Sequence, residues 1–426
     1  MLSIRFGVRA ALAAALVVLA SSPADALTWT CEAITRKGLA DPAMGTFAGK
    51  FGKKRHGGPA INSSGDVVFF ATPKGGPRRL YLYPNAGAPV ILASAGDPAP
   101  GGGSFTRFEQ PSINDAGDVA FFGDLASGEG VFVDPAAGPM LEVAVTGDAA
   151  PGGGSFDTFD GVARINASGD VAFLATVSGF PTGVFVYDGG TMTIASIARV
   201  GDATLDGREI CSFVAPSVGL GGSLTAFQVG TKVSCANALE PELYGIYRDT
   251  GAGIDRVALQ GDATPIGGNV YDDFLGDPDL NEIDQVLFRA TITGTLKSTG
   301  LFLFDAVGPT TITVVRTGDA AATVGGFLRT ITEPNLTNGA QAGFRANLGN
   351  TPAKEGIFLY DGVDEAVVTK SSTVPTGLFL PGSVYQKIYE EIGVSRSGTW
   401  VTYSATVKQP PGNGGAKIGL FRCEGS

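Results

Sequence analysis

The sequence is poor in histidine, and this scarcity limits the chemistry available to the protein. His56 is the one histidine among 426 residues. Ser-His-Asp and Cys-His catalysis therefore have no candidate base except His56 itself, which stands in a loop rich in glycine and lysine. Histidine-based zinc sites are excluded for the same reason. The sequence alone assigns no catalytic residue.

Positive charge is also in short supply. The chain carries 30 Lys and Arg against 41 Asp and Glu, which gives a formal net charge of −11. An acidic surface is unsuited to nucleic acid or to anionic membranes, so we expect neither as a partner. No phosphate-binding loop or dinucleotide fingerprint is present, because the glycine runs 101–103 and 152–154 open no helix. We expect no cofactor, with calcium as the one candidate exception.

One long apolar run stands at the N-terminus. Arg5 and Arg9 precede the apolar residues 10–20, and the A-x-A cleavage site 24–26 follows them. This order is typical of a secretory signal peptide, and the run is too short for a spanning helix. We predict that residues 1–26 are removed and that residues 27–426 form a single exported domain. The expected location is periplasmic or extracellular, with no membrane span.

What the sequence has in abundance is an internal repeat. Residues 113–121 (INDAGDVAF) return as 165–173 (INASGDVAF), and an earlier copy stands at 61–69 (INSSGDVVF). Asparagine bonds nearby backbone amides and glycine allows positive φ, so each copy indicates a tight turn followed by a buried strand. The turn residues predicted in this way are Asn62, Gly65, Asn114, Gly117, Asn166 and Gly169. A ligand-binding role for these asparagines is the alternative.

Weaker copies extend the repeat to seven units along the chain; they stand at 218–227, 280–288, 336–344 and 395–403. In the unit 105–148, three runs of β-branched and aromatic residues predict three strands, and a fourth is expected around Phe105 and Phe108. No stretch has a convincing helical period. Units too small to fold alone must stack, so we predict an all-β fold. The expected architecture is a closed β-propeller of seven blades, each with three to four antiparallel strands.

The two termini are expected to complete one blade between them. The seventh unit ends without its last strand, and residues 28–35 supply a strand of the missing kind at the N-terminus. A blade shared by both ends closes the ring and leaves no seam of unpaired strand edges.

Four cysteines support this closure. In an exported chain they predict a disulfide framework, for which three pairings are open. Cys31 stands in the N-terminal strand and Cys423 in the last strand, so a bond between them would lock the shared blade. Cys211 and Cys235 lie within the divergent fourth unit and would pair locally. The rival pairings link distant blades and are disfavoured.

The element Asn-x-x-Gly-x-x-Ala-Phe, at 114–121 and again at 166–173, resembles that of bacterial exported proteins with tandem NxxGxxAF repeats. The resemblance covers nearly the whole mature chain and implies export and a propeller-like repeat fold. It implies no activity, because that family has no function to carry over. Thr337 and Ser395 stand in place of the asparagine in two of the weaker copies.

Carboxylates remain as candidates for chemistry. Five Gly-Asp pairs follow the repeat, and we interpret their aspartates as turn caps; the pairs begin at Gly96, Gly147, Gly201, Gly261 and Gly318. The densest acidic stretch departs from the repeat, and its candidate calcium ligands are Asp272, Asp273, Asp277 and Asp279. Oxygen-rich loops suit Ca²⁺, although this stretch lacks the alternating spacing of a known calcium loop.

Three functions fit these patterns. The first is an exported, monomeric binding or interaction propeller that holds a glycan or an extracellular protein. The second is a carboxylate-dependent hydrolase or lyase acting on polysaccharide, and the third is a structural envelope protein. The repeat is interrupted mainly at 205–243 and 270–284, a modest departure that favours binding over catalysis. Any specific activity should lie where the repeat fails.

Overall fold

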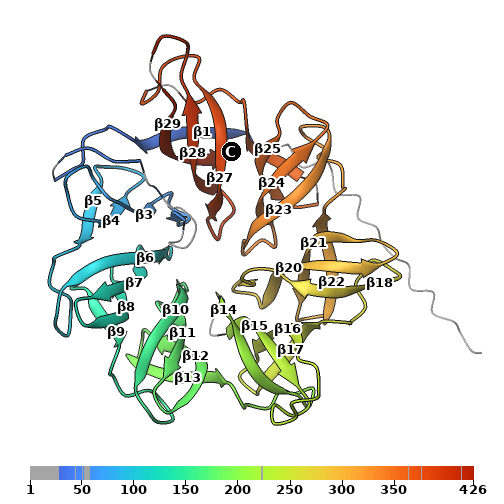
Figure 1. The fold of residues 1–426 in the computed structure, drawn as a ribbon. Helices are drawn as coiled ribbons and strands as arrows, with labels where there is room; N and C mark the ends of the chain where they lie inside the picture. Colours follow the sequence, from blue (N-terminus) through green and yellow to red (C-terminus); the bar gives the residue numbers. More distant parts are fainter. Residues whose placement is uncertain are drawn as a thin grey trace, which may run out of the picture.

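A computed structural model describes residues 28–43, 45–49, 51, 58–221, 224–362, 364–375, 377–413 and 415–426. In this part of the chain, seven antiparallel sheets are arranged as a ring around a common axis (Figure 1). The predicted all-β propeller of seven blades is thereby confirmed. No helix among the described residues is long and apolar enough to cross a membrane. His56 lies outside the described residues.

Six blades are each built from strands that are consecutive in sequence and run from the axis outward, and the seventh adds β1 to the last three strands. The first four blades comprise β2 (Ala60–Ile61), β3 (Val67–Ala71), β4 (Arg79–Tyr83) and β5 (Val90–Ser94); β6 (Phe105–Ile113), β7 (Val119–Leu125), β8 (Gly128–Asp134) and β9 (Leu141–Val145); β10 (Phe156–Ile165), β11 (Val171–Val177), β12 (Phe180–Asp188) and β13 (Thr193–Arg199); and β14 (Glu209–Gly221), β15 (Leu224–Lys232), β16 (Leu243–Asp249) and β17 (Ile254–Leu259). The last three comprise β18 (Asn269–Phe274), β19 (Asp279–Leu280), β20 (Gln285–Gly294), β21 (Ser298–Asp305) and β22 (Thr310–Arg316); β23 (Phe327–Leu336), β24 (Ala342–Gly349), β25 (Glu355–Tyr360) and β26 (Asp364–Thr369); and β27 (Val384–Val394), β28 (Trp400–Lys408), β29 (Lys417–Gly425) and β1 (Trp29–Arg36).

The seventh blade is shared by the two ends of the domain, as the sequence predicts. Strand β1 is its outermost strand and pairs antiparallel with β29, so the blue strand lies beside the dark red one in Figure 1. Cys31 lies opposite Cys423 in this register, and the two form a disulfide. The second disulfide joins Cys211 to Cys235. Two disulfides are typical of a protein that folds outside the reducing cytoplasm.

An arginine fastens the shared blade to the first blade. The Arg422 guanidinium donates to the carbonyl oxygen of Gly65 at 2.7 Å and to that of Asn85 at 3.1 Å, and it lies over the ring of Tyr83. Because Arg422 is only 3% exposed, these charge-assisted bonds are well shielded from water. The closing contact of the ring is therefore polar as well as covalent.

In most blades the core is built on stacked aromatic rings from the second and third strands. Stacked pairs occur in six blades: Phe69–Tyr81, Phe121–Phe132, Phe173–Phe185, Phe288–Phe302, Phe344–Phe358 and Tyr403–Phe421. The first ring of each pair is the aromatic residue that ends the repeat motif. Such pairs add to the free energy that area burial alone provides. The repeated phenylalanine thus fills the core, as the pattern indicates.

The repeated asparagine closes its own turn and also joins neighbouring blades. The Asn114 Oδ1 accepts the amide of Asp118 at 2.9 Å, while its Nδ2 donates to the Asn166 carbonyl oxygen of the next blade at 3.0 Å. Asn62 donates in the same way to Asn114 at 3.2 Å. Gly117, three residues after Asn114, has a φ of 91°, which a residue with a side chain rarely adopts. These residues build the turns and the contacts between blades.

The aspartates of the five Gly-Asp pairs cap the turns that leave the outer strands. Each accepts the backbone amide of the residue three positions earlier, at 2.7 to 3.0 Å; they are Asp97, Asp148, Asp202, Asp262 and Asp319. They therefore serve the fold of each repeat.

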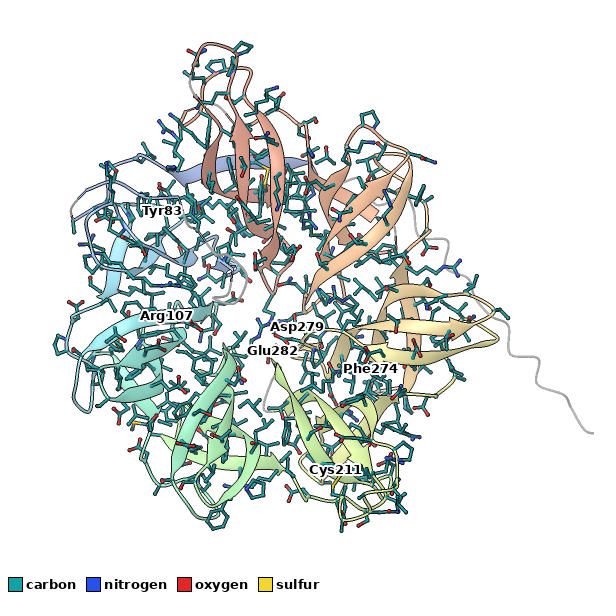
Figure 2. The ribbon with its side chains drawn as sticks, viewed as in Figure 1. Tyr83, Arg107, Cys211, Phe274, Asp279 and Glu282 are labelled. Atoms are coloured by element: carbon teal, nitrogen blue, oxygen red, sulfur yellow. A yellow bond between two sulfur atoms is a disulfide. The ribbon has the colours of Figure 1, made fainter. Side chains whose placement is uncertain are left out.

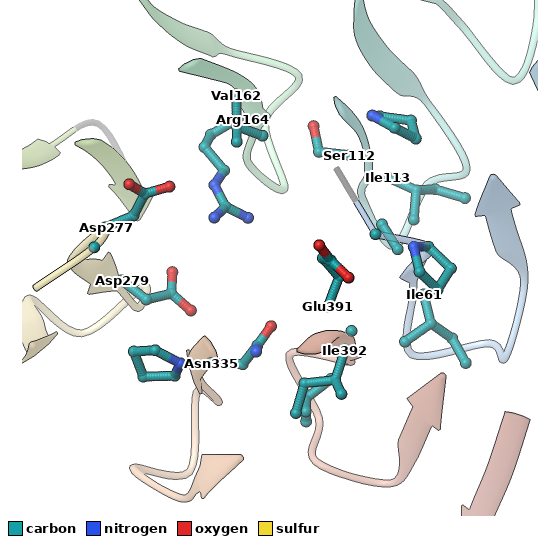
Figure 3. Close-up of a pocket in the computed structure, with 18 of the residues that line it drawn as sticks. Ile61, Ser112, Ile113, Val162, Arg164, Asp277, Asp279, Asn335, Glu391 and Ile392 are labelled. Carbon is teal, nitrogen blue, oxygen red and sulfur yellow. The ribbon is translucent and has the colours of Figure 1, made fainter. Parts of the chain in front are cut away.

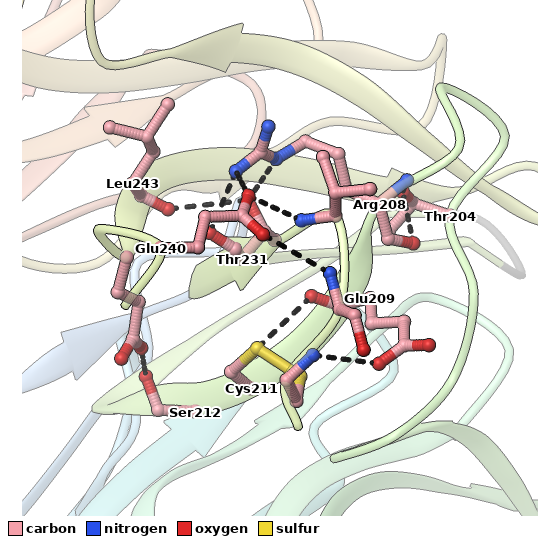
Figure 4. Close-up of a disulfide and its surroundings, with 12 residues drawn as sticks. Thr204, Arg208, Glu209, Cys211, Ser212, Thr231, Glu240 and Leu243 are labelled. Atoms are coloured by element: carbon pink, nitrogen blue, oxygen red, sulfur yellow. Dashed lines mark hydrogen bonds and ion pairs between the residues drawn. A yellow bond between two sulfur atoms is a disulfide. The ribbon is translucent and has the colours of Figure 1, made fainter. Parts of the chain in front are cut away.

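The first break in the repeat, in the fourth blade, is a loop held by the second disulfide (Figure 4). The Cys235 amide donates to the Glu209 carboxylate at 2.8 Å, and the Val233 amide donates to Glu240 at 2.6 Å. Arg208 lies 3.7 Å from the Glu240 carboxylate. The loop is thus fastened to the rim of its blade by carboxylates and a covalent bond.

Candidate functional site

The inner strands carry bulges that redirect their last residues. In β10 the pairing with β11 shifts between Asp160 and Arg164, and β6 and β23 shift at corresponding places. In the fifth blade the interruption is wider, because β18 ends at Phe274 and β19 begins only at Asp279. Pro111 and Pro334 stand at such bulges, where a ladder hydrogen bond is not needed. Bulges commonly re-aim side chains toward a site.

Beyond these bulges the inner strands of six blades enclose a cavity of about 560 Å³, which we call the central cavity (Figure 3). One position of the repeat lines it in each of these blades. It is the residue two places before the repeated asparagine, or before the residue that replaces that asparagine, and it pairs with the residue that precedes the core aromatic. We call it the channel position. It is occupied by Ala60, Ser112, Arg164, Asp279, Asn335 and Gly393.

Asp279 is a fixed part of the cavity wall. It is 7% exposed, and its carboxylate accepts the amide of Leu336 at 2.7 Å and lies 3.1 Å from the Arg396 guanidinium. Arg396 also donates to the carbonyl oxygen of Leu336 at 2.6 Å. Because both charges are paired, the group holds the fifth, sixth and seventh blades together beside the cavity.

Arg289 is tied down in a similar way. Its guanidinium donates to the carbonyl oxygen of Ile331 at 2.7 Å and to that of Leu275 at 3.3 Å. It therefore braces the loop between β18 and β19 against the sixth blade, and the wall that carries Asp277 is rigidly supported.

Arg164 is different from the other charged side chains of the cavity. It extends from the end of β10 into the central cavity, as Figure 3 shows. Within the described part of the chain, no hydrogen bond or ion pair engages it, and its Nε atom is buried without a partner. The residue as a whole is partly exposed, but a buried Nε without a partner adds nothing to the stability of the fold, so this placement needs an explanation other than stability.

The remaining charged side chains of the lining are acidic. Asp277 and Glu391 direct their carboxylates toward the same space as Arg164 (Figure 3), and Glu390 also belongs to the lining. The apolar part of the wall is aliphatic, and no aromatic side chain occurs among the described lining residues. The described part of the lining therefore presents charged and hydrogen-bonding groups together with aliphatic side chains.

The structure separates the four predicted calcium ligands into two pairs. Asp277 and Asp279 line the central cavity, and Figure 2 shows Asp279 near the middle of the ring. Asp272 and Asp273 are exposed on β18. Among the described residues, no group of three or more acidic, cysteine or histidine side chains is placed to hold a metal ion. Calcium binding stays a prediction that titration calorimetry can test.

Sequence reasoning located one wall of the cavity, the break at 270–284, and missed Arg164 and Asn335. A signal for these two residues was present in the sequence. At the channel position, two residues before the repeated asparagine, the copies carry unlike residues, whereas the turn and core positions around it are similar. A comparison of the copies position by position would have found it.

A closed ring of seven blades with a charged cavity on its axis defines a β-propeller with a charged central cavity. The chain belongs to the family of unknown function DUF7453, which matches residues 28–183 and 134–426. No curated protein is significantly similar to it in sequence.

Among solved structures, the β-propeller domain of the Trilobed protease from Pyrococcus furiosus is 9% identical with a TM-score of 0.49, covering 83% of this chain and 94% of that one. An oligogalacturonate lyase in complex with manganese is 9% identical with a TM-score of 0.48, covering 94% and 96%. TolB from Acinetobacter baumannii is 12% identical with a TM-score of 0.36, covering 84% and 64%. At these values the similarity says nothing about activity.

Proposed function

We propose that the protein is an exported binding propeller whose ligand occupies the central cavity. The channel position carries this proposal. Residues that only build the repeat are alike from blade to blade, yet here four blades contribute a hydroxyl, a guanidinium, a carboxylate and an amide, from Ser112, Arg164, Asp279 and Asn335. A concave site of a few hundred Å³ with a few convergent polar groups is the usual form of a small-molecule site.

The state of Asp279 favours binding over catalysis. A general acid or base must be within reach of the proton that it transfers, whereas the Asp279 carboxylate is already engaged by Arg396 and by the Leu336 amide. The carboxylate-dependent polysaccharide enzyme is therefore the second candidate. A structural envelope protein is the third candidate function, and a purely structural role would not explain the unpaired Arg164 in the cavity.

Export is part of the same proposal. The N-terminal segment has the features of a secretory signal, and the two disulfides fit an oxidising compartment. The intact mass of the protein recovered from the periplasm or medium of an expressing bacterium should correspond to a chain that starts at Leu27. A mass that includes residues 1–26 would contradict this.

A thermal-shift panel tests ligand binding. The panel consists of glucose, glucuronate, alanine and dialanine, and the same compounds are tested on an Asn335→Ala variant. We expect at least one compound to raise the melting temperature of the wild type and to lose that effect in the variant, because Asn335 lines the cavity. Asn413→Ala, in an exposed loop, is the matched control and should respond like the wild type.

Two results would contradict the proposal. One is a panel in which no compound shifts the melting temperature; the other is a shift that Asn335→Ala retains in full. Release of new ends from a polysaccharide, lost on Asp277→Asn substitution, would favour the enzyme instead.

A further inference from the structure

We infer that the central cavity recognises a small organic acid, a molecule with one carboxylate, bound by Arg164, and with hydroxyl or ammonium donors that meet the acidic side of the cavity. Sugar acids and amino acids share this chemistry. The inference rests on the proposed function, because it names the ligand class of the same site.

The first step is the unsatisfied guanidinium. Of the charged side chains that line the cavity in the described residues, Arg164 is the one with no hydrogen bond or ion pair, and its Nε is shut off from solvent. By contrast Arg289 and Arg396, on the same wall, are both anchored to backbone carbonyls. A planar guanidinium with free donors is best matched by a carboxylate, which can accept two parallel N–H bonds.

The second step is the charge around Arg164. Asp277, Glu390 and Glu391 face the same cavity, and Asp279 forms part of its wall. Three guanidinium groups, those of Arg164, Arg289 and Arg396, stand against these four carboxylates, so the described lining has no excess of positive charge to offset two or more negative charges on a ligand. Phosphate and sulfate esters are therefore poor candidates, and a single carboxylate fits best.

The third step is the need for donors on the ligand. Carboxylate oxygens only accept hydrogen bonds when ionised. An ionised carboxylate offers about four lone-pair sites, so Asp277 and Glu391 can accept hydrogen bonds from a ligand in addition to the interactions they already make. Hydroxyl groups or an ammonium on the same molecule supply such donors. The cavity therefore selects an acid that is itself rich in donors.

The size of the cavity agrees with this class. Its volume of about 560 Å³ lies within the range of small-molecule sites. Aliphatic side chains, among them Ile61, Ile113 and Ile165, also line it. They leave the charged groups as the main determinants of orientation.

Titration calorimetry with two matched pairs of compounds tests the inference. Glucuronate and glucose differ in the carboxylate, and so do alanine and alaninamide. We expect at least one acid to bind and its neutral or amide counterpart to bind at least about 30-fold more weakly, the usual effect of removing one partner from a shielded charge pair. Which acid binds distinguishes a sugar-acid site from an amino-acid site. Inorganic phosphate should not compete.

The Arg164→Gln variant identifies the residue responsible. It should weaken binding of the acid by at least about 30-fold, while Arg107→Gln, the same change at an arginine outside the cavity lining, should not. The melting temperature of Arg164→Gln should stay the same or rise, since the substitution removes an unpaired charge. A fall of several degrees would mark Arg164 as a structural residue and overturn the inference.

The outcomes separate this inference from the proposed function. If neutral glucose binds as tightly as glucuronate, or if Arg164→Gln retains full affinity for the acid, the acid hypothesis is wrong. Binding that is nonetheless lost in Asn335→Ala would leave the cavity as the site. If neither Arg164→Gln nor Asn335→Ala weakens the binding of any compound, both proposals fail.

Discussion

Replacement of Cys31 and Cys423 by alanine is expected to lower the free energy of unfolding more than the same replacement of Cys211 and Cys235. The two disulfides span 392 and 24 residues in sequence. In the chain-entropy description, loops of these lengths correspond to stabilisation of up to about 6 and about 3 kcal/mol. The longer bond also holds β1 to β29, and so keeps the outer strand of the shared blade in place.

Urea denaturation of the two double variants, under identical conditions, measures this difference. The variant without the closing disulfide should unfold at clearly lower urea, and its ring should open at the seventh blade before the other blades unfold. Hydrogen exchange would show this as early loss of protection in β1 and β29. Equal midpoints for the two variants would contradict the role given to ring closure.

The second large effect is expected at Asp41, whose replacement by alanine should cost about 3–5 kcal/mol of stability. The Asp41 side chain is fully buried and accepts hydrogen bonds from the Arg79 guanidinium and the Tyr81 hydroxyl. Burial, together with the bond to Asp41, raises the pKa of Tyr81, so the phenol stays protonated and donates. Without Asp41, a buried guanidinium and hydroxyl lose their acceptor.

The other blades show what could replace this charged group. At the places of Asp41, Arg79 and Tyr81, the third blade has Ala150, Gly183 and Phe185. We therefore expect the triple variant Asp41→Ala, Arg79→Gly and Tyr81→Phe to recover most of the stability that Asp41→Ala loses, because no charge is then left unpaired.

Chemical denaturation of the single and triple variants provides the measurement. Asp97→Ala, at an exposed turn cap, is the control and should cost only about 1 kcal/mol. A triple variant as unstable as Asp41→Ala would show that the buried group is stabilising in itself and not through its pairing.

The architecture followed from the sequence because it depends on local, repeated chemistry. A turn at Asn114 and Gly117 and an aromatic residue at Phe121 recur in order, and each copy must stack on its neighbours to bury its core. The missing strand of the last unit and the N-terminal strand were enough to predict the shared blade. The contact from Asn114 to the next blade was not predictable, because it depends on how the blades are placed in space.

The site was only partly predictable for the same reason. The break at 270–284 pointed to Asp277 and Asp279, but nothing local separates them from Asp272 and Asp273, which lie exposed on β18 outside the cavity lining. Arg164 looks like an ordinary strand residue in sequence. Its significance depends on the absence of a partner across the ring, among the described residues, and this is a property of the folded structure.

A crystal structure of the protein with its bound acid would locate the ligand; the acid is glucuronate or alanine, whichever binds more tightly. We predict that the ligand lies in the central cavity, with its carboxylate about 2.7–2.9 Å from the guanidinium nitrogens of Arg164 and its hydroxyl or ammonium groups toward Asp277 and Glu391. An acid bound on the outer strands of the ring, with only solvent in the central cavity, would contradict it.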